Sequence, residues 1–348
     1  MRVLVTGGAG FIGSHAAKRL LAEGNEVTIL DAVLPGRGHE GSVAALRRWA
    51  GPRAGRLGFV RGDAGDSDLV ERAMVAARAE AVMHFAALAY VGESVEKPLE
   101  YHGNNARATL GVLDACLRLG APRFVFSSSC AVYGVPLDDR PMGEDHPQSP
   151  INPYGWTKVH GERLLLDAAA EMQRRGAPFA CCALRYFNAA GADGEGVLGE
   201  VHDPETHLIP AALRAAAGLS GAVTIHGDDY PTPDGTCVRD FVHVEDIVDA
   251  HVRALGAMDP ARRDRWAFNL GTGRGFSVRE VIAECERITG RSIEAVTGPR
   301  RPGDPARLVA DAGLIGERLG WRGERSRLDV MVSGAWEWLR ARPRGYDG

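Results

Sequence analysis

The hydrophobic residues in the first half of the chain fall in short, nearly continuous runs, separated by stretches with a helical spacing. The runs lie at residues 2–6, 26–30, 57–60, 81–85 and 123–128. Apolar runs of this length without alternation are typical of strands buried on both faces. The stretches that follow them, for example 11–23 and 67–78, have the periodicity of helices. This alternation predicts an α/β fold, a doubly wound parallel sheet of the Rossmann type.

The second half of the chain is less regular. One more buried strand is expected around residues 179–187, followed by a Gly- and Asp-rich loop at 191–207 and a turn-rich segment at 227–236. Such loops lie on the surface and often carry binding groups. Helices are expected near 244–256, 277–288 and 326–341, with short strands between them. We predict a first domain at 1–180 and a smaller C-terminal α/β lobe at 181–348, from which some segments return to the first domain.

A glycine motif joins the first predicted strand to the first predicted helix. Gly7, Gly10 and Gly13 form the pattern GxxGxxG. In such a motif the first glycine permits a tight turn and the second lets the backbone approach a pyrophosphate. The third allows helix and strand to pack closely, while the helix N-terminus faces the phosphates. The motif therefore predicts a dinucleotide site.

The second strand ends in a carboxylate that selects the dinucleotide. Asp31 lies 18 residues beyond Gly13, where it would accept hydrogen bonds from the adenosine ribose and repel a 2′-phosphate. The next two residues are Ala32 and Val33, so NAD is favoured over NADP. Arg37, six residues after Asp31, keeps NADP open as the alternative.

Two later strand ends fit the same site. Asp63 and Ala64 follow the third strand, where a side chain can meet adenine, although Asp63 is also compatible with an ordinary loop carboxylate. Phe85 and Ala86 end the fourth strand, near the expected dinucleotide.

The segment NPYGWTK combines a helix start with a Tyr–Lys pair. Asn152 is a good helix cap, and Pro153 suits the first helical position. Tyr154 and Lys158 then lie four residues apart on one helical face. A phenol has a pKa near 10, and both an ammonium and a nicotinamide cation favour the phenolate, so the tyrosine would act as a base near neutral pH.

Hydroxyl groups at the end of the fifth strand strengthen this interpretation. Ser127, Ser128 and Ser129 stand at the expected carboxyl edge of the sheet. Open α/β sheets bind ligands at that edge. A serine hydroxyl there would share the substrate proton with Tyr154, whereas three serines that merely end a strand are the structural alternative.

Composition narrows the class of protein. The chain has 348 residues and a formal net charge of −4, without a basic stripe or acidic tail, which argues against nucleic acid and anionic membranes as partners. We find neither a signal-peptide pattern nor an apolar run of about 20 residues that would span a membrane. The six cysteines form no CxxC pair, so we expect a reducing, cytoplasmic setting. His202 and His207 lie in a loop without a recognisable carboxylate–histidine set, so no metal site is expected.

The motifs together resemble the extended short-chain dehydrogenase/reductase superfamily and, within it, the UDP-glucose 4-epimerase family. The resemblance runs over nearly the whole chain, through TGGAGFIGSH, VGESVEKPLEYHGNN, FSSSCAVYG, PINPYGWTK, LRYFNAAGA, PETHLIP, GDDYPTPDGTCVRDFVHVEDI, FNLGTG and RRPGD. It implies an NAD-dependent isomerase that interconverts UDP-glucose and UDP-galactose through a transient 4-keto sugar. It also implies a homodimer, formed through helices near 96–119 and 153–175.

The resemblance assigns roles to individual residues. The catalytic residues would be Ser129, Tyr154 and Lys158. NAD would be held by Gly7, Gly10, Phe11, Ile12, Gly13, Asp31, Asp63, Ala64, Phe85, Ala86, Asn104, Tyr154, Lys158 and Phe187. The UDP-sugar would contact Ser129, Asn188, Leu208, His226, Arg239, Arg301 and Asp304. Arginine forks suit phosphates and a carboxylate suits a ribose diol, which agrees with the last three assignments.

Four positions depart from the family pattern. Ala89 replaces a lysine that contacts the cofactor, and His207 replaces an asparagine. His226 stands where an aromatic ring stacks on uracil, and Leu308 stands where a tyrosine restricts the sugar pocket in some members. The sugar and the base therefore stay open, with UDP-N-acetylglucosamine, a UDP-pentose or another nucleotide sugar as alternatives.

Three other functions are less consistent with the sequence. A nucleotide-sugar dehydratase would need acidic residues after the strand-end hydroxyl, where this chain has Cys130 and Ala131. A dehydrogenase that releases NADH has no need of the UDP motifs. A non-catalytic NAD-binding protein would not need Tyr154 and Lys158.

Overall fold

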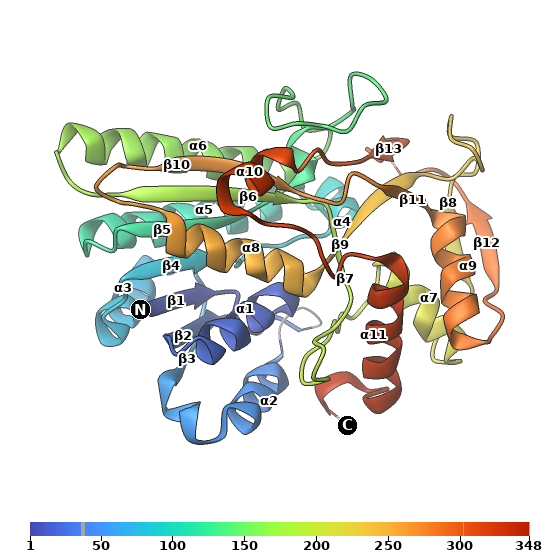
Figure 1. Ribbon diagram of the computed structural model, residues 1–348, viewed down its shortest axis with the longest axis horizontal. Helices are drawn as coiled ribbons and strands as arrows, with labels where there is room; N and C mark the ends of the chain where they lie inside the picture. The colour runs from blue at the N-terminus through green and yellow to red at the C-terminus, as the bar shows by residue number, and fades with distance from the viewer. Residues whose placement is uncertain (36–38, 302, 348) are drawn as a thin grey trace.

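A parallel sheet of seven strands organises the larger part of the molecule (Figure 1). The computed structural model describes residues 1–35, 39–301 and 303–347. The strand order is β10-β6-β5-β4-β1-β2-β3, and neighbours pair in parallel throughout. The strands are β1 (Arg2–Thr6), β2 (Glu26–Asp31), β3 (Leu57–Arg61), β4 (Ala81–His84), β5 (Arg123–Ser129), β6 (Ala180–Tyr186) and β10 (Arg265–Leu270). The order reverses between β1 and β4, which creates the switch point where such sheets bind dinucleotides.

Helices cover both faces of this sheet and bury its alternating side chains. Val3 and Val5 of β1 belong to one hydrophobic cluster, and Leu4 between them belongs to another. The first cluster packs under α1 (Phe11–Ala22), α2 (Glu40–Ala50), α8 (Val244–Ala257) and α10 (Gly313–Leu319). The second packs under α3 (Ser67–Ala77), α5 (Pro98–Arg118) and α6 (Pro153–Arg174). The predicted doubly wound fold is therefore confirmed.

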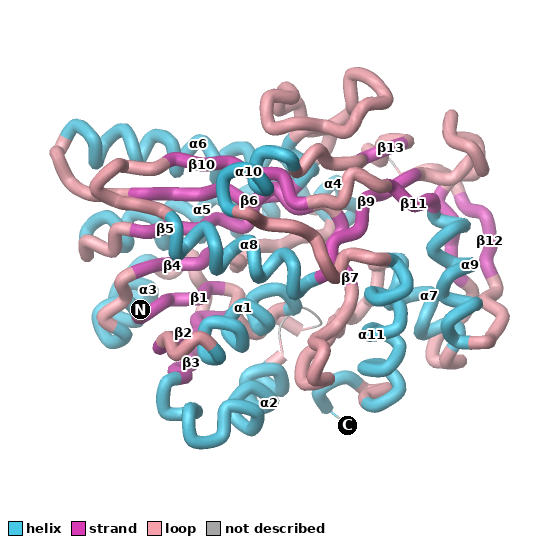
Figure 2. The backbone as a smooth tube through the Cα atoms, in the orientation of Figure 1, coloured by secondary structure: helices cyan, strands magenta, loops and turns pink. Residues whose placement is uncertain are grey.

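A smaller lobe stands beside the carboxyl ends of the strands, at the right of Figure 1. It contains a four-stranded sheet of β7 (Asn188–Ala190), β9 (Val238–His243), β11 (Gly275–Ser277) and β13 (Arg307–Leu308). A second pair joins β8 (Val223–His226) to β12 (Ala295–Gly298). The helices α7 (Leu208–Ala216), α9 (Val278–Thr289) and α11 (Leu328–Ala341) enclose a third hydrophobic cluster. Figure 2 shows that loops make up more of this lobe than of the layered part.

Four segments from residue 180 onward belong to the large layered part, and one of them is α10, which packs against β10. The strand β6 continues the sheet from β5, β10 forms its edge next to β6, and α8 packs on α1. The sequence predicted that some later segments return, but it did not identify β10 as the seventh strand. The division of the chain at residue 180 stays a prediction, because the two parts interleave. Within the described residues, no helix is both long and apolar enough to cross a membrane.

Candidate active site

The end of β5 and the start of α6 meet at the carboxyl edge of the large sheet. Asn152 caps α6, since its Oδ1 accepts a hydrogen bond of 2.8 Å from the Gly155 amide, and Pro153 follows at the first helical position. A Cβ atom at Gly155 would lie 2.4 Å from the Ala131 carbonyl oxygen, and one at Gly161 would lie 2.4 Å from the Phe126 ring. These two glycines therefore permit α6 to lie directly against β5 and the turn that follows it.

The close approach brings the predicted catalytic groups together. Lys158 Nζ donates a hydrogen bond of 2.7 Å to the carbonyl oxygen of Ser127 and lies 5.6 Å from the centre of the Tyr154 ring. The Ser129 hydroxyl is one of the groups that lower the pKa of Tyr154. All three side chains are buried, with Lys158 only 3% exposed. The end of β5, with Ser129, and the start of α6, with Tyr154 and Lys158, thus lie together as the sequence predicted.

Burial pushes both titratable groups of this site toward their neutral forms. It raises the pKa of the Tyr154 hydroxyl, and the neighbouring Tyr186 adds to that effect. It also lowers the pKa of Lys158 to about 7, against a smaller opposing effect of Glu162. Without a bound ligand, Tyr154 is therefore a protonated phenol, and further positive charge is required before it can act as a base.

The glycine loop forms a cradle into which side chains do not fit. Gly7 has a φ of 70°, and a Cβ there would lie 2.5 Å from the Ala86 amide nitrogen. A Cβ at Gly13 would lie 2.2 Å from the Gly7 carbonyl oxygen. Gly10 is the N-cap of α1, whose first two residues are Phe11 and Ile12. The bare backbone and the start of the helix fit the pyrophosphate of a dinucleotide.

Asp31 lies at the end of β2, next to this loop. Its Oδ2 accepts a hydrogen bond of 2.9 Å from the Ala9 amide, and its Oδ1 accepts one of 2.7 Å from the Val33 amide. Burial raises the pKa of this carboxyl group, although both hydrogen bonds oppose the shift. The geometry fits a carboxylate that receives a ribose. Arg37, the cation that left NADP open, lies outside the described residues.

The other predicted cofactor residues lie along the same sheet edge, with one exposed exception. Phe85 and Ala86 follow β4, and Ala64 is buried after β3. Asn104 lies on α5, and Phe187 follows β6. Asp63 is 45% exposed as a side chain, and its Oδ2 accepts a hydrogen bond of 2.6 Å from Arg107. This ion pair with α5 gives Asp63 a structural role beside the predicted one.

The predicted substrate residues of the small lobe gather around β9. Arg239 on β9 is 9% exposed and forms an ion pair with Asp304, and it pairs in register with Leu308 on β13. Arg239 also acts on the pKa of Cys130, which burial raises to about 12 and the guanidinium lowers. The small lobe therefore reaches the residue that follows Ser129.

The remaining substrate residues are more dispersed. Asn188 lies on β7 and pairs in register with Phe241 of β9, and Leu208 is the first residue of α7. His226 ends β8, where burial and then the charge of Arg301 lower its pKa. Arg301 itself is exposed. No interaction in the described part of the chain joins Leu208 to Arg239.

The sequence missed a buried ion pair directly beneath the catalytic groups. Glu162 on α6 accepts hydrogen bonds of 2.9 and 2.6 Å from the Arg185 guanidinium of β6, and both side chains are 8% exposed. Glu162 also accepts a hydrogen bond of 2.5 Å from Ser128. The spacing of 23 residues carries no periodic signal, so only the packing of α6 against β6 reveals the contact.

Asn105 is a second positioning residue that the sequence did not single out. Its Oδ1 accepts a hydrogen bond of 2.8 Å from the Leu88 amide, and its Nδ2 donates to the Leu88 carbonyl and to Thr157 on α6. It therefore ties the loop after β4 to both α5 and α6. Its neighbour Asn104, which had been assigned to the cofactor, donates a hydrogen bond of 2.9 Å to Asn105.

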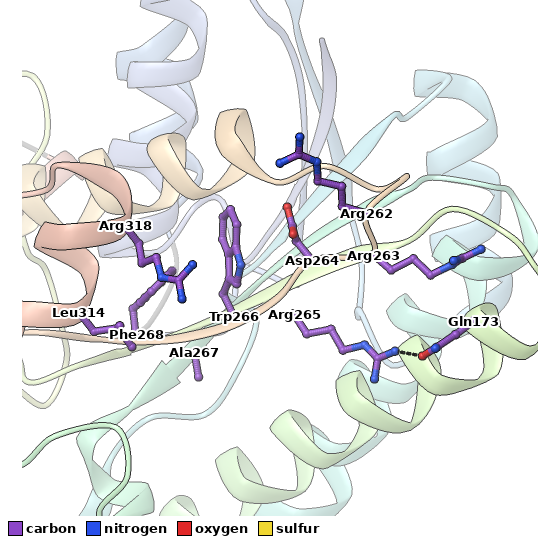
Figure 3. Close-up of a pocket in the computed structure, with 10 residues that line it drawn as sticks. All are labelled: Gln173, Arg262, Arg263, Asp264, Arg265, Trp266, Ala267, Phe268, Leu314 and Arg318. Carbon is purple, nitrogen blue, oxygen red and sulfur yellow. Dashed lines mark hydrogen bonds between the residues drawn. The ribbon is translucent and has the colours of Figure 1, made fainter.

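The pocket drawn in Figure 3 lies away from this site. It is lined by Gln173, Arg262, Arg263, Asp264, Arg265, Trp266, Ala267, Phe268, Leu314 and Arg318. These residues surround the beginning of β10, whereas Ser129 and Tyr186 stand at the carboxyl ends of β5 and β6. None of the predicted site residues lines the pocket, so we do not assign the catalytic function to it.

Comparison with known proteins agrees with this geometry. The chain is 44% identical to UDP-glucose 4-epimerase of Lactobacillus helveticus over 347 residues, which cover 100% of this chain and 99% of the relative. It is 43% identical to UDP-arabinose 4-epimerase 1 of Arabidopsis thaliana, over 99% of this chain and 80% of that protein. The crystal structure of UDP-glucose 4-epimerase from Bifidobacterium longum in complex with NAD+ and UDP superimposes with a TM-score of 0.92. The two chains are 38% identical, and 99% of each is covered.

A family-level match covers most of the chain. Residues 3–271 match the sequence model of the NAD dependent epimerase/dehydratase family. This range includes the glycine loop, Ser129, Tyr154, Lys158 and Arg239. The protein belongs to the NAD dependent epimerase/dehydratase family.

Proposed function

We propose that this protein is an NAD-dependent isomerase that interconverts UDP-glucose and UDP-galactose by inverting carbon 4 of the sugar. The observation that carries the proposal is the contact of α6 with β5, which brings Tyr154, Lys158 and Ser129 to the switch-point edge of the sheet. Full-length similarity to UDP-glucose 4-epimerases, one of them crystallised with NAD+ and UDP, supports the same activity.

The cofactor residues fit NAD. Gly7, Gly10 and Gly13 leave room for the pyrophosphate at the start of α1, and Asp31 accepts the adenosine ribose. NAD held by these residues would supply reversible hydride transfer at carbon 4 of the sugar. Because the isomerisation has no net redox change, the protein would have no need to release this cofactor.

Tyr154 carries the proton. It takes the proton of the sugar 4-hydroxyl and later returns it, and Ser129 shares that proton through its hydroxyl. Burial raises the pKa of Tyr154, so the base form depends on neighbouring positive charge. Lys158 has a pKa of about 7 and can supply such a charge near neutral pH. Burial thus favours the neutral form of both Tyr154 and Lys158, the two groups that would share the proton.

The small lobe holds the nucleotide. Arg239 offers a guanidinium to the diphosphate, and Asp304 orients it and accepts the uridine ribose. Arg301 and His226 lie near each other and complete the uridine side, while Asn188 and Leu208 contact the diphosphate or sugar. An anchor on the nucleotide leaves the sugar free to present either face to the cofactor.

The choice of sugar is the finer part of the proposal. The similarity to a UDP-arabinose 4-epimerase makes a UDP-pentose the second candidate. Leu308, buried beside Arg239, is smaller than the tyrosine of some relatives and leaves more room for a 2-acetamido sugar. We expect glucose and galactose to be the best substrates.

A panel of nucleotide sugars tests the proposal. The purified protein is incubated separately with UDP-glucose, UDP-N-acetylglucosamine and UDP-arabinose, and NMR identifies the products. We expect UDP-galactose from the first, without a change in total mass. Loss of one water from the substrate would instead identify a dehydratase, and accumulation of NADH would identify a dehydrogenase.

The same proposal includes a cytoplasmic homodimer. Support for a reducing compartment comes from the six cysteines, which are all free and buried.

Support for a dimer comes from apolar side chains that α5 and α6 expose, namely Leu110 (54%), Trp156 (43%) and Leu166 (50%). Light scattering coupled to gel filtration is expected to give twice the chain mass of 37.2 kDa, and a Leu110→Glu variant to give the monomer.

A further inference from the structure

Two carboxylates and two histidines converge in the loop that leads into α7. They are Glu200, His202, Glu205 and His207. Each offers one ligand atom, and these atoms all lie within 4.8 Å of one another. All four residues lie within one short stretch of loop, but the sequence of a loop does not predict its path, so their convergence could not be predicted. It corrects the expectation that His202 and His207 have no carboxylate partners.

The Nδ1 atoms of both histidines face the carboxylates. His202 Nδ1 lies 3.3 Å from Glu200 Oε1 and 3.7 Å from Glu205 Oε2. His207 Nδ1 lies 2.5 Å from Glu200 Oε1 and 3.8 Å from Glu205 Oε1. Four ligands around a tetrahedral zinc ion at 2.0–2.1 Å would stand about 3.3 Å apart, so small shifts of side chains suffice.

The burial of the group distinguishes it from a surface ion pair. The side chains of Glu200, Glu205 and His202 are only 5%, 7% and 11% exposed. His202 Nδ1 is inaccessible to solvent and makes no hydrogen bond. The nearest acceptor, Glu200 Oε1, lies 3.3 Å away, so this nitrogen is aimed into the cluster without a hydrogen bond and is placed to act as a ligand.

We propose that Glu200, His202, Glu205 and His207 bind one divalent transition-metal ion, with zinc the best match. Two imidazoles and two carboxylates are ligands that zinc accepts, and calcium or magnesium would instead require mainly oxygen ligands. The metal would replace the hydrogen bond that joins His207 Nδ1 to Glu200 Oε1. His207, whose side chain is 45% exposed, leaves a path by which the ion enters.

The position indicates a structural role for the ion. Four protein ligands leave no open coordination site for chemistry. The His202 and His207 rings contact the Tyr90 ring at centroid distances of 5.6 and 6.0 Å, and Tyr90 precedes α4 (Val91–Glu96). Nearby, Leu88 packs in one cluster with Tyr154. The ion would therefore fasten the loop before α7 to the segment beside the active site.

Metal content tests this inference without any measurement of turnover. The NAD-bound protein, made without a polyhistidine tag, is treated with chelator, exposed to zinc chloride, desalted and analysed by mass spectrometry for zinc. We expect about one zinc per chain. We also expect zinc to raise the thermal midpoint of the wild-type protein by several degrees, since a ligand of the folded state stabilises it.

Variants separate the proposed site from other histidines. His202→Gln and His207→Gln are each expected to lower zinc affinity at least tenfold in competition with a chromophoric chelator. His160→Gln, which changes an exposed histidine of α6, is the matched control and is expected to bind as the wild type does. Circular dichroism and bound NAD check that each variant is folded.

One combined outcome overturns the proposal. If the wild type retains far less than one zinc per chain, and zinc leaves its thermal midpoint unchanged, the four side chains form an ion-pair network only. Because the wild-type measurement stands alone, this conclusion holds even where a variant does not fold. Turnover of UDP-glucose is measured separately, so that failure of the metal site and failure of the proposed isomerase activity remain distinguishable.

Discussion

The two regions of the candidate active site differ in the charge state that their environment favours. At the edge of the large sheet, burial favours the neutral forms of both Tyr154 and Lys158. In the small lobe, Arg239 and Asp304 form an ion pair, and the Asp304 side chain keeps 25% of its exposure. A group that exchanges a proton needs a pKa that allows both its protonated and its deprotonated form near the working pH. A group that anchors a diphosphate must instead keep its charge. The difference fits the role proposed for each region.

Lys158 can be neutral because the neighbouring carboxylate, that of Glu162, is already paired with Arg185. Glu162 is the carboxylate whose charge acts on Lys158, but Arg185 occupies it through two hydrogen bonds. Lys158 therefore donates to a carbonyl oxygen, that of Ser127. A carboxylate free to pair with Lys158 would hold the lysine fully charged, and its pKa could not lie near neutrality.

The largest effect is expected from removing Tyr154, the proposed proton carrier. Tyr154→Phe should lower kcat about 1,000-fold, in the range of general acid–base catalysis. NAD content and thermal stability should stay near those of the wild type, since the ring is kept. Tyr346→Phe, which removes a hydroxyl bonded to Gly199, serves as the control and should keep its turnover. Wild-type turnover in Tyr154→Phe would remove the catalytic role from this region.

Next in size is the loss of the buried ion pair. Glu162→Gln leaves the Arg185 charge buried without its counterion and should lower the free energy of unfolding by about 3 kcal/mol. Urea denaturation measures it. The double variant Glu162→Gln/Arg185→Met should recover part of the loss. Asp167→Asn, which breaks the exposed Arg163–Asp167 pair, should cost less than 1 kcal/mol. Equal costs for the buried and exposed pairs would contradict this account.

A change to the Arg239–Asp304 pair of the small lobe should weaken nucleotide binding more than it lowers kcat. Arg239→Met removes a charged donor and leaves Asp304 unpaired, so we expect UDP to bind about tenfold to a hundredfold more weakly. Calorimetry with UDP measures this change directly, and KM for UDP-glucose should rise more than kcat falls. Arg300→Met, which breaks the exposed pair with Asp229, is the control. A fall in kcat at unchanged UDP affinity would place Arg239 in the catalytic region instead.

The smallest effect concerns pH. The pKa of Lys158 is about 7 in the folded chain against 10.5 for an ordinary lysine, so the unfolded chain binds more protons above pH 7. Its contribution to stability is therefore present at high pH and lost as the pH falls through 7.

The pH effect is measured against a lysine-free variant. Between pH 7 and pH 8.5, without NAD, the wild type should gain about 1.5 kcal/mol in unfolding free energy relative to Lys158→Met. Lys97→Met removes an exposed lysine and should show no such difference from the wild type. Parallel pH profiles of the wild type and Lys158→Met would show that burial does not lower the lysine pKa.

Much of the layered region could be predicted from the sequence, because its signals are local. Apolar runs marked β1 to β6, the cap at Asn152 marked the start of α6, and the spacing of Tyr154 and Lys158 marked their shared face. The small lobe offered shorter strands and long loops, so its pairings could not be predicted. The partners of β9, for example, come from residues 188–190, 275–277 and 307–308.

The sequence by itself determined which residues are proposed for the chemistry: the glycine loop, Asp31, the serines of β5, and Tyr154 with Lys158. Their types and spacings follow from rules that act over a few residues. Only the tertiary structure decided their electrostatics, because a pKa depends on burial and on charges distant in the chain, such as Glu162 and Arg185. It also decided that Glu200, His202, Glu205 and His207 converge, since the path of a loop depends on the elements around it rather than on its own sequence.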